Sequence, residues 1–325
     1  MTTAIDILIL RALFSNPSRY VSGEDLAAQA GVSRAAIWKH LDQLQKIGYP
    51  IEAQPHQGYR LLAPPDVWCA DEIAARLPDP APGEPNWRVL LFQQTASTND
   101  LVWREAQSGA QEGLVIIAEQ QSSGRGRQGR QWQSCAKSGL YASALLRPHW
   151  PLSQITRLTI VSSLAVAEAV EKLCGKEVRI KWPNDVFMRG KKLGGILTEV
   201  QADPEAIRFA VVGIGLNVSQ TKADFPDALH AIATSLKIET EQDFRRADLL
   251  VEMLAAMQRH YREPFEDVRQ AWSERCFSLG QTISVQTPAG RQIGQAVGLD
   301  ENGALLLRAE SGRITPITAG DILPH

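Results

Sequence analysis

The chain has 325 residues, of which 44% are hydrophobic and 22% charged, and its formal net charge is −2. At roughly 150 residues per domain, this length predicts two or three domains. The near-neutral charge excludes a global electrostatic attraction to nucleic acid or to a membrane, so any DNA binding must come from a local patch.

Nothing in the chain predicts export or membrane insertion. No charged region followed by an apolar run and a small-residue cleavage site opens the sequence. The longest apolar stretch, 152–174, is interrupted by charged residues. The four cysteines lie far apart without a CxxC pair, which argues against a zinc site and a disulfide framework. We therefore expect free thiols, no metal-ligand cluster, no membrane partner and a cytoplasmic location.

Residues 1–64 show the pattern of a winged helix-turn-helix domain. An apolar stripe predicts a first helix at about 7–14. Ser22 can cap a second helix that stops at Gly31, and Ser33 can cap a third. The two helices joined by A-G-V-S are typical of a DNA-binding unit.

The third helix is the element expected to contact DNA. The predicted contact residues are Ser33, Arg34, Ala35 and Lys39. Segments 51–54 and 59–62 flank P-H-Q-G and predict a hairpin, the wing. Residues 1–66, the head of the chain, hold six Lys+Arg and six Asp+Glu, so a single head would bind DNA weakly. Two paired heads would make more phosphate contacts and bind DNA more tightly.

Residues 65–277 predict a second domain built on a mainly antiparallel sheet. The expected strands are 89–92, 115–118, 140–146, 178–181, 195–200 and 209–212. The expected helices are 70–77, 152–173 and 245–261. Several strands follow one another without an intervening helix, which favours an antiparallel sheet with helices packed on it over a doubly wound fold.

Residues 278–325 predict a third, small domain. Short apolar segments alternate with the turn signals P-A-G, D-E-N-G and E-S-G, a spacing typical of a small barrel of four or five strands. The fold class of the whole chain is therefore predicted to be α+β.

The strongest chemical signal is G-R-G-R-Q-G-R, residues 124–130. Its three glycines let backbone N–H groups approach a ligand, and its three arginines supply charge that no residue nearby in the sequence neutralises. The loop favours an anionic, phosphate-bearing ligand. It is not a P-loop, because Arg130 and Gln131 stand where Lys and Ser/Thr are needed.

Two further motifs carry polar groups at strand ends. In R-I-K-W-P-N-D a strand delivers Lys181, and Pro183 forces a turn that presents Asn184 and Asp185. The lysine is either an edge charge or a functional cation. In T-A-S-T-N-D, residues 95–100, one side chain can cap the next helix, and the other polar side chains remain available for further hydrogen bonds.

The remaining motifs and residue types favour a site that neutralises charge over one that uses covalent catalysis. G-I-G-L-N, residues 213–217, lacks the third glycine of a dinucleotide fingerprint and predicts a strand that ends at a tight turn. The histidines lie outside these loops, so no Ser-His-Asp set is expected. Hydrogen-bonding groups and fixed cations are what phosphoryl or nucleotidyl transfer requires.

Taken together, these motifs resemble the biotin protein ligase family, in the bifunctional bacterial form that is also the biotin operon repressor. S-T-N, G-R-G-R-Q-G-R, K-W-P-N-D, K-L-G-G-I-L and G-I-G-L-N occur in the family's order, after S-R-A-A-I-W-K-H in the head. The resemblance spans the whole chain. It implies a class II synthetase-like central domain and a C-terminal SH3-like barrel.

The resemblance also implies roles for individual residues. The implied catalytic residues are Lys181 and Arg125. The implied biotin-binding residues are Ser97, Thr98, Asn99, Gln121, Arg125, Gly126, Arg127 and Lys181. The implied ATP-binding residues are Arg127, Trp132, Asn184, Asp185, Lys192 and Asn217.

The implied reaction joins biotin and ATP into biotinyl-5′-adenylate, with Mg²⁺ as cofactor. Biotin then passes to a lysine of the biotin carboxyl carrier protein domain of a carboxylase. The resemblance further implies that adenylate-bound copies form a homodimer that binds operator DNA. Three alternatives stay open: a lipoate-activating ligase, a transcription factor whose core only senses a small molecule, and a winged helix that no longer binds DNA.

Overall fold

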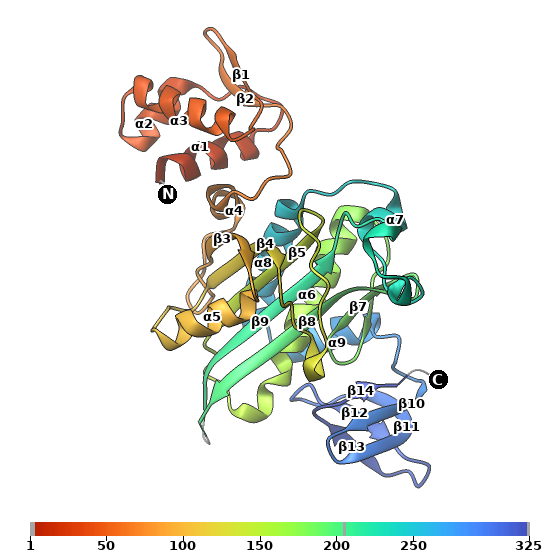
Figure 1. Ribbon diagram of the computed structural model, residues 1–325. Helices are drawn as coiled ribbons and strands as arrows, with labels where there is room; N and C mark the ends of the chain where they lie inside the picture. Colours follow the sequence, from red (N-terminus) through yellow and green to blue (C-terminus); the bar gives the residue numbers. More distant parts are fainter. Residues whose placement is uncertain (1–3, 204–205, 324–325) are drawn as a thin grey trace. The chain divides into compact units, whose positions relative to one another are not determined.

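The computed structural model describes residues 4–203 and 206–323, which separate into two compact units (Figure 1). The first unit runs to Pro78 and also takes in Arg245–Val251. The second comprises Asp79–Phe244 and the chain from Glu252 onward. The sequence-based domain boundaries after residues 64 and 277 stay predictions.

The first unit is a helix-turn-helix domain with a wing and one additional helix. Its elements are α1 (Ala4–Ser15), α2 (Gly23–Ala30), α3 (Arg34–Lys46), β1 (Ile51–Gln54), β2 (Gly58–Leu61) and α4 (Ala70–Arg76). The hydroxyl of Ser22 accepts hydrogen bonds from two backbone N–H groups of α2, and that of Ser33 accepts one from α3. Gly31 ends α2 in the left-handed conformation, at φ 64°. The predicted caps of α2 and α3 are confirmed, whereas α1 begins at Ala4, before the predicted stretch 7–14.

The core of this domain comes from one face of each helix. In α3 the buried residues Ile37, Leu41 and Leu44 follow the spacing i, i+4, i+7. They pack in one cluster with Leu10 and Leu13 of α1. Burying this stripe leaves the opposite face of α3 in solvent.

A buried carboxylate, that of Glu72 in α4, joins separate parts of the first unit. It is fully buried, and both of its oxygens accept hydrogen bonds from Arg245, at 2.8 and 2.9 Å. Arg76 donates to it at 2.8 Å and the hydroxyl of Tyr49 at 2.5 Å. Burial, and then the neighbouring Glu72 charge, raises the pKa of Tyr49 above its usual range, so Tyr49 stays a donor. A charge buried this deeply is tolerable only with such partners.

The second unit is built on one seven-stranded sheet. Its strands are β3 (Arg88–Thr95), β4 (Leu114–Gln121), β5 (Gly139–Leu146), β6 (Arg179–Lys181), β7 (Asp185–Met188), β8 (Lys191–Ala202) and β9 (Ile207–Asn217). Their spatial order is β3-β4-β5-β9-β8-β7-β6, and only the β3–β4 pair is parallel. The mainly antiparallel sheet is confirmed. Strand β7 was not predicted, because its four residues gain strand structure from pairing with β6 and β8.

Helices α5 (Thr98–Gln107) and α6 (Thr156–Cys174) pack against this sheet, and α9 (Phe265–Arg275) packs against α6 and β6. Two further helices are α7 (Leu236–Thr240) and α8 (Arg246–Arg262), and the start of α8 belongs to the first unit. The predicted helix 152–173 is divided in the structure, with a 3₁₀ turn at Leu152–Gln154 before α6. Helix α9 was not predicted. It is fixed by packing, for the buried indole of Trp272 donates a hydrogen bond to Ser163 of α6 at 2.9 Å.

The last strands form a separate five-stranded antiparallel sheet (Figure 1). They are β10 (Thr282–Thr287), β11 (Gly290–Leu299), β12 (Leu305–Arg308), β13 (Ile314–Ile317) and β14 (Asp321–Ile322), in the order β13-β12-β11-β10-β14. The predicted α+β class is thus confirmed. Among residues 4–203 and 206–323, no helix is long and apolar enough to cross a membrane.

We predict that Glu72→Ala destabilises the first unit by about 3–5 kcal/mol, because it leaves Arg76 and Arg245 to share the partly exposed Asp248 as their counter-charge. Chemical unfolding of the full-length chain measures the change. The matched control is Asp42→Ala, which breaks the exposed pair with Lys46 and should cost less than about 0.5 kcal/mol. Equal losses for the two variants would contradict a structural role of the buried carboxylate.

Candidate active site

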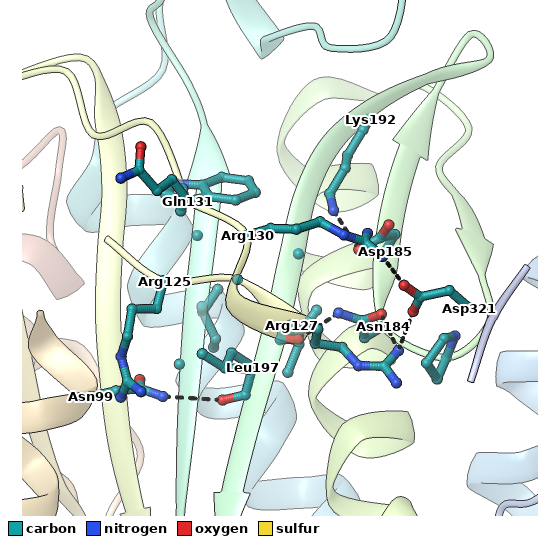
Figure 2. A pocket seen from close by; sticks show the side chains of 18 of the residues that line it. Asn99, Arg125, Arg127, Arg130, Gln131, Asn184, Asp185, Lys192, Leu197 and Asp321 are labelled. Atoms are coloured by element: carbon teal, nitrogen blue, oxygen red, sulfur yellow. Dashed lines mark hydrogen bonds and ion pairs between the residues drawn. The ribbon is translucent and has the colours of Figure 1, made fainter. Parts of the chain in front are cut away.

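A pocket in the second unit brings together motifs that lie far apart in the sequence (Figure 2). It is partly open to solvent, and polar and charged side chains make up much of its lining. The sequence-predicted substrate and nucleotide residues that line it are Ser97, Thr98, Asn99, Gln121, Arg125, Gly126, Arg127, Trp132, Lys181, Asn184, Asp185 and Lys192. The pocket therefore holds both the cations and the polar groups expected from the motifs.

Asn217 is the predicted site residue that is not among the residues lining this pocket. It is buried at the end of β9, where its Nδ2 donates to the carbonyl of Thr234 at 2.9 Å. Its Oδ1 accepts from Gln220 at 3.3 Å. These contacts tie the strand end to the following loop, and a nucleotide contact for Asn217 stays a prediction.

The start of α5 forms the polar end of the pocket. Ser97, Thr98 and Asn99 are all buried. The expectation that one of these side chains caps the helix is wrong for the N-cap residue, since Ser97 makes no side-chain capping bond. The side chain of Gln121, in β4, caps the helix instead, by accepting a hydrogen bond from the backbone N–H of Thr98 at 2.9 Å. Capping from another strand leaves the α5 side chains for contacts of their own.

The glycines of G-I-G-L-N make room for two pocket side chains. A Cβ atom on Gly213 would lie 2.2 Å from Oδ1 of Asn99, and one on Gly215 would lie 2.5 Å from the indole of Trp132. Both glycines belong to β9, whose end at Asn217 confirms the predicted strand end. Their function is thus to let side chains lie against the strand.

The arginines of the glycine-rich loop are not free charges. Arg125 pairs with Asp100 at 2.6 Å and with Glu199 at 2.8 Å. Arg127 and Arg130 both pair with Asp321. No residue nearby in the sequence neutralises this loop, as expected, but carboxylates distant in the sequence come close to it in the fold and do so. Asp321 lies in β14, so the C-terminal sheet contributes directly to the pocket wall.

Arg127 lies deeper in the pocket wall than its neighbours. It donates to Oδ1 of Asn184 at 3.1 Å (Figure 2). It also donates to the carbonyl of Gly320 at 3.1 Å. Burial lowers the pKa of this guanidinium, partly offset by Asp185. An arginine nevertheless stays charged near neutral pH, so it provides a fixed cation.

The lysines face the same region. Burial lowers the pKa of Lys181, while the carboxylate of Asp185 raises it and the charge of Lys192 lowers it further. Lys192 forms an ion pair with Asp185 at 2.6 Å and lies 5.8 Å from the ring centre of Trp132. The buried indole N–H of Trp132 has no hydrogen-bond partner in the described part of the chain.

Sequence reasoning missed several residues at this site. Arg130, Gln131, Leu197 and Asp321 line the pocket, and Glu199 holds Arg125. The motif K-L-G-G-I-L could have pointed to Leu197, since it runs along β8 beside the pocket. No local signal marked Asp321, which lies in the C-terminal sheet.

The predicted DNA-contacting residues lie in the first unit. Ser33, Arg34, Ala35 and Lys39 are exposed at the start of α3. The hydroxyl of Ser33 caps the helix by accepting from the N–H of Ala36, at 3.2 Å. Arg34, Ala35 and Lys39 share the exposed helix face, the one that enters the major groove in helix-turn-helix proteins.

The pocket's chemistry suits reactions of anions. It combines five cations, two carboxylates and a set of amide and hydroxyl groups. In residues 4–203 and 206–323 no group of three or more His, Cys, Asp or Glu side chains could hold a metal ion. A pocket of this composition neutralises and orients phosphate and carboxylate groups.

Comparison with known proteins assigns the three parts of the chain to known families. The model of the biotin/lipoate A/B protein ligase family matches residues 91–217. A helix-turn-helix domain model matches residues 6–60, and the biotin protein ligase C-terminal domain matches 278–323.

Whole-chain relatives carry the same combination. The bifunctional ligase/repressor BirA of Bacillus spizizenii is 36% identical, over 95% of this chain and 96% of that protein. The bifunctional ligase/repressor BirA of Escherichia coli is 29% identical, over 97% and 96%. A solved biotin protein ligase from Aquifex aeolicus, in complex with biotin and ATP, superposes with a TM-score of 0.63 at 30% identity, covering 72% of this chain and 97% of that one. This chain belongs to the biotin protein ligase family, in its bifunctional form with an N-terminal repressor domain.

Proposed function

We propose that this protein adenylates biotin with ATP in the pocket described above and then transfers biotin to a lysine of the biotin carboxyl carrier domain of a carboxylase. The single observation that carries the proposal is the meeting of Lys181, Arg127 and Lys192 with the polar α5 terminus in one pocket. This arrangement serves a ligand that is neutral and hydrogen-bonding at one end and anionic at the other.

We assign the polar end to the ring system of biotin. The residues for this role are Ser97, Thr98, Asn99 and Gln121. Hydrogen bonds to one another and to the sheet fix the side chains of Thr98, Asn99 and Gln121. A ureido ring offers one carbonyl acceptor and two N–H donors, which such groups can satisfy. The buried hydrogen-bonding groups would reject a ligand that leaves them unpaired.

We assign the cationic part of the wall to the reacting groups. An oxygen of the biotin carboxylate attacks the α-phosphorus of ATP, the new O–P bond forms, and the bond to pyrophosphate breaks. Two anions must approach each other, so Lys181 and Arg127 would offset their repulsion and stabilise the charge that grows on the α-phosphate. Arg125 and Gly126 would close over the product and keep water from the mixed anhydride.

We place the nucleotide beside Trp132. Its unpaired indole N–H is available as a donor, and Lys192 and Asn184 lie on the phosphate side of the pocket. The carboxylate of Asp185 would hold a Mg²⁺ ion, which usually takes one or two protein carboxylates with phosphate oxygens. When bound, Mg²⁺ would supply charge neutralisation of the phosphates.

In the second step the acceptor lysine replaces AMP. Its neutral amine attacks the carbonyl carbon of the adenylate, the C–N bond forms, and the C–O bond to AMP breaks with its electron pair on the phosphate. The proton of the amine leaves to solvent. Cations at the phosphate again stabilise the departing charge.

The repressor function requires two heads. We propose that adenylate-bound copies form a homodimer through β3, one of the two edge strands of the large sheet. Its residues Leu90, Leu91 and Phe92 are each 37% exposed. An unpaired edge with apolar side chains is suited to pairing with a second copy about a two-fold axis. Two α3 helices would then reach both halves of a palindromic operator.

We further propose three domains at 1–64, 65–277 and 278–325, with the reaction in the cytoplasm, where ATP and carboxylases are available. The C-terminal domain would act through Asp321 on the arginine loop.

We expect the purified protein to release pyrophosphate from ATP only when biotin is present. A coupled pyrophosphate assay with biotin, with lipoate and with neither tests this. Release with lipoate instead of biotin would change the substrate. Biotin binding without release would make the core a sensor rather than an enzyme.

We expect kcat/KM for biotin to fall as the pH rises, and to do so at a pH below about 10.4, the usual pKa of a lysine side chain. The reason is that burial lowers the pKa of Lys181, so the required cation loses its proton early. The Lys181→Arg variant should react more slowly but lose this alkaline limb, since arginine stays protonated. A limb that persists unchanged in the arginine variant would exclude Lys181 as its source.

We expect the double variant Arg34→Ala/Lys39→Ala to lose at least about tenfold in operator affinity. The salt slope should fall by roughly 0.9 for each phosphate contact removed. Fluorescence anisotropy with a duplex selected from random DNA by the wild-type protein, with biotin and ATP, measures both. Lys46→Ala, at the other end of α3, is the matched control. Full binding by the double variant would indicate a head that does not use this helix face.

A further inference from the structure

Glu199 lies at the end of a chain of polar contacts that begins at Gln121. Its Oε2 accepts a hydrogen bond from Nδ2 of Asn99 at 2.7 Å. Oδ1 of Asn99 accepts from the hydroxyl of Ser143 at 2.5 Å, and this hydroxyl lies 2.7 Å from that of Thr98. Asn99 and Ser143 are buried, so these contacts are protected from solvent.

Counting hydrogens gives this chain a direction. A carboxylate can only accept, so Asn99 must turn its NH₂ group toward Glu199. Oδ1 of Asn99 then faces Ser143, which donates its single hydrogen there. The hydroxyl of Thr98, 2.7 Å away, must then donate its own single hydrogen to Ser143 rather than to Oε1 of Gln121, which lies 3.1 Å from it. The acceptor at the end of the chain therefore sets the orientation of the Asn99 amide and of both hydroxyls.

The same oxygen of Glu199 also holds the arginine loop. Nη2 of Arg125 donates to it at 2.8 Å and to Asp100 at 2.6 Å. Figure 2 shows Arg125 beside Asn99, whose amide is also 3.4 Å from the carbonyl oxygen of Leu197. Asp100 and Glu199 line a second hollow of about 820 Å³, and Arg125 lines both hollows. Asp100 thus shares one function of Glu199 without contacting Asn99 in any bond described.

We propose that Glu199 is a positioning residue for biotin recognition, fixing the orientation of the Asn99 amide and linking it to Arg125 of the loop. The proposal rests on the proposed function, in which Asn99 contacts the biotin ring. Glu199 need not touch biotin itself. It determines which groups of Asn99, Ser143 and Thr98 are presented to the ring.

Two variants separate the effect of the negative charge beside Arg125 from the effect of the Asn99 orientation. Glu199→Gln has nearly the same shape but can donate as well as accept, so it permits the flipped Asn99 amide and removes one charge. Asp100→Asn removes one charge from Arg125 and leaves the Asn99 contact intact. Titration calorimetry with biotin in the absence of ATP measures the dissociation constant of each.

We expect Glu199→Gln to weaken biotin binding roughly tenfold, about the effect of one misplaced buried hydrogen bond. Asp100→Asn should change it less than about threefold. In an Asn99→Ala background the Glu199→Gln effect should shrink to less than about twofold, because Glu199 acts through Asn99. The KM for ATP in pyrophosphate release should change equally in the two charge variants.

Two results would overturn the proposal. Equal weakening by Glu199→Gln and Asp100→Asn would mean that only the charge on Arg125 matters. An undiminished Glu199→Gln effect in the Asn99→Ala background would mean that Glu199 does not act through Asn99. Failure of the proposed function is distinct from both, since it would appear as wild-type protein without biotin binding.

Discussion

The arginines and lysines around the pocket repel one another, and the carboxylates that pair with the arginines fix the structure of this site. Arg125 is held by Asp100 and Glu199, while Arg127 and Arg130 share Asp321. These acids come from α5, β8 and β14, so the loop is fixed by three elements. An anionic ligand that enters must compete for the same guanidinium groups, which couples binding to loop position.

Space at the pocket is set by the backbone of β9. Gly213 and Gly215 let Asn99 and Trp132 lie directly against the strand. The polar ring contacts and the nucleotide contact proposed above therefore occupy neighbouring positions on one strand. Biotin and ATP would meet at the point where Lys181 enters from β6.

The two activities of the family make different demands on the chain. Adenylation requires fixed cations and polar groups on rigid strands, which the large sheet provides. DNA binding requires an exposed helix face with a few basic residues, and the head carries only a local patch of them. Membership of the bifunctional ligase/repressor family joins both in one chain. The proposed dimer would compensate for the modest charge of each head.

The sequence by itself determined the caps of α2 and α3 in the head, because Ser22, Gly31 and Ser33 are local capping signals. It also determined the α+β class and the motifs that line the pocket, since strand periodicity and loop composition are local properties. Only the tertiary structure decided the partners of the arginines, the contribution of Asp321 and the reason for the β9 glycines. Strand β7 and helix α9 were missed for the same reason. All of these depend on contacts between residues far apart in the chain, which no local pattern records.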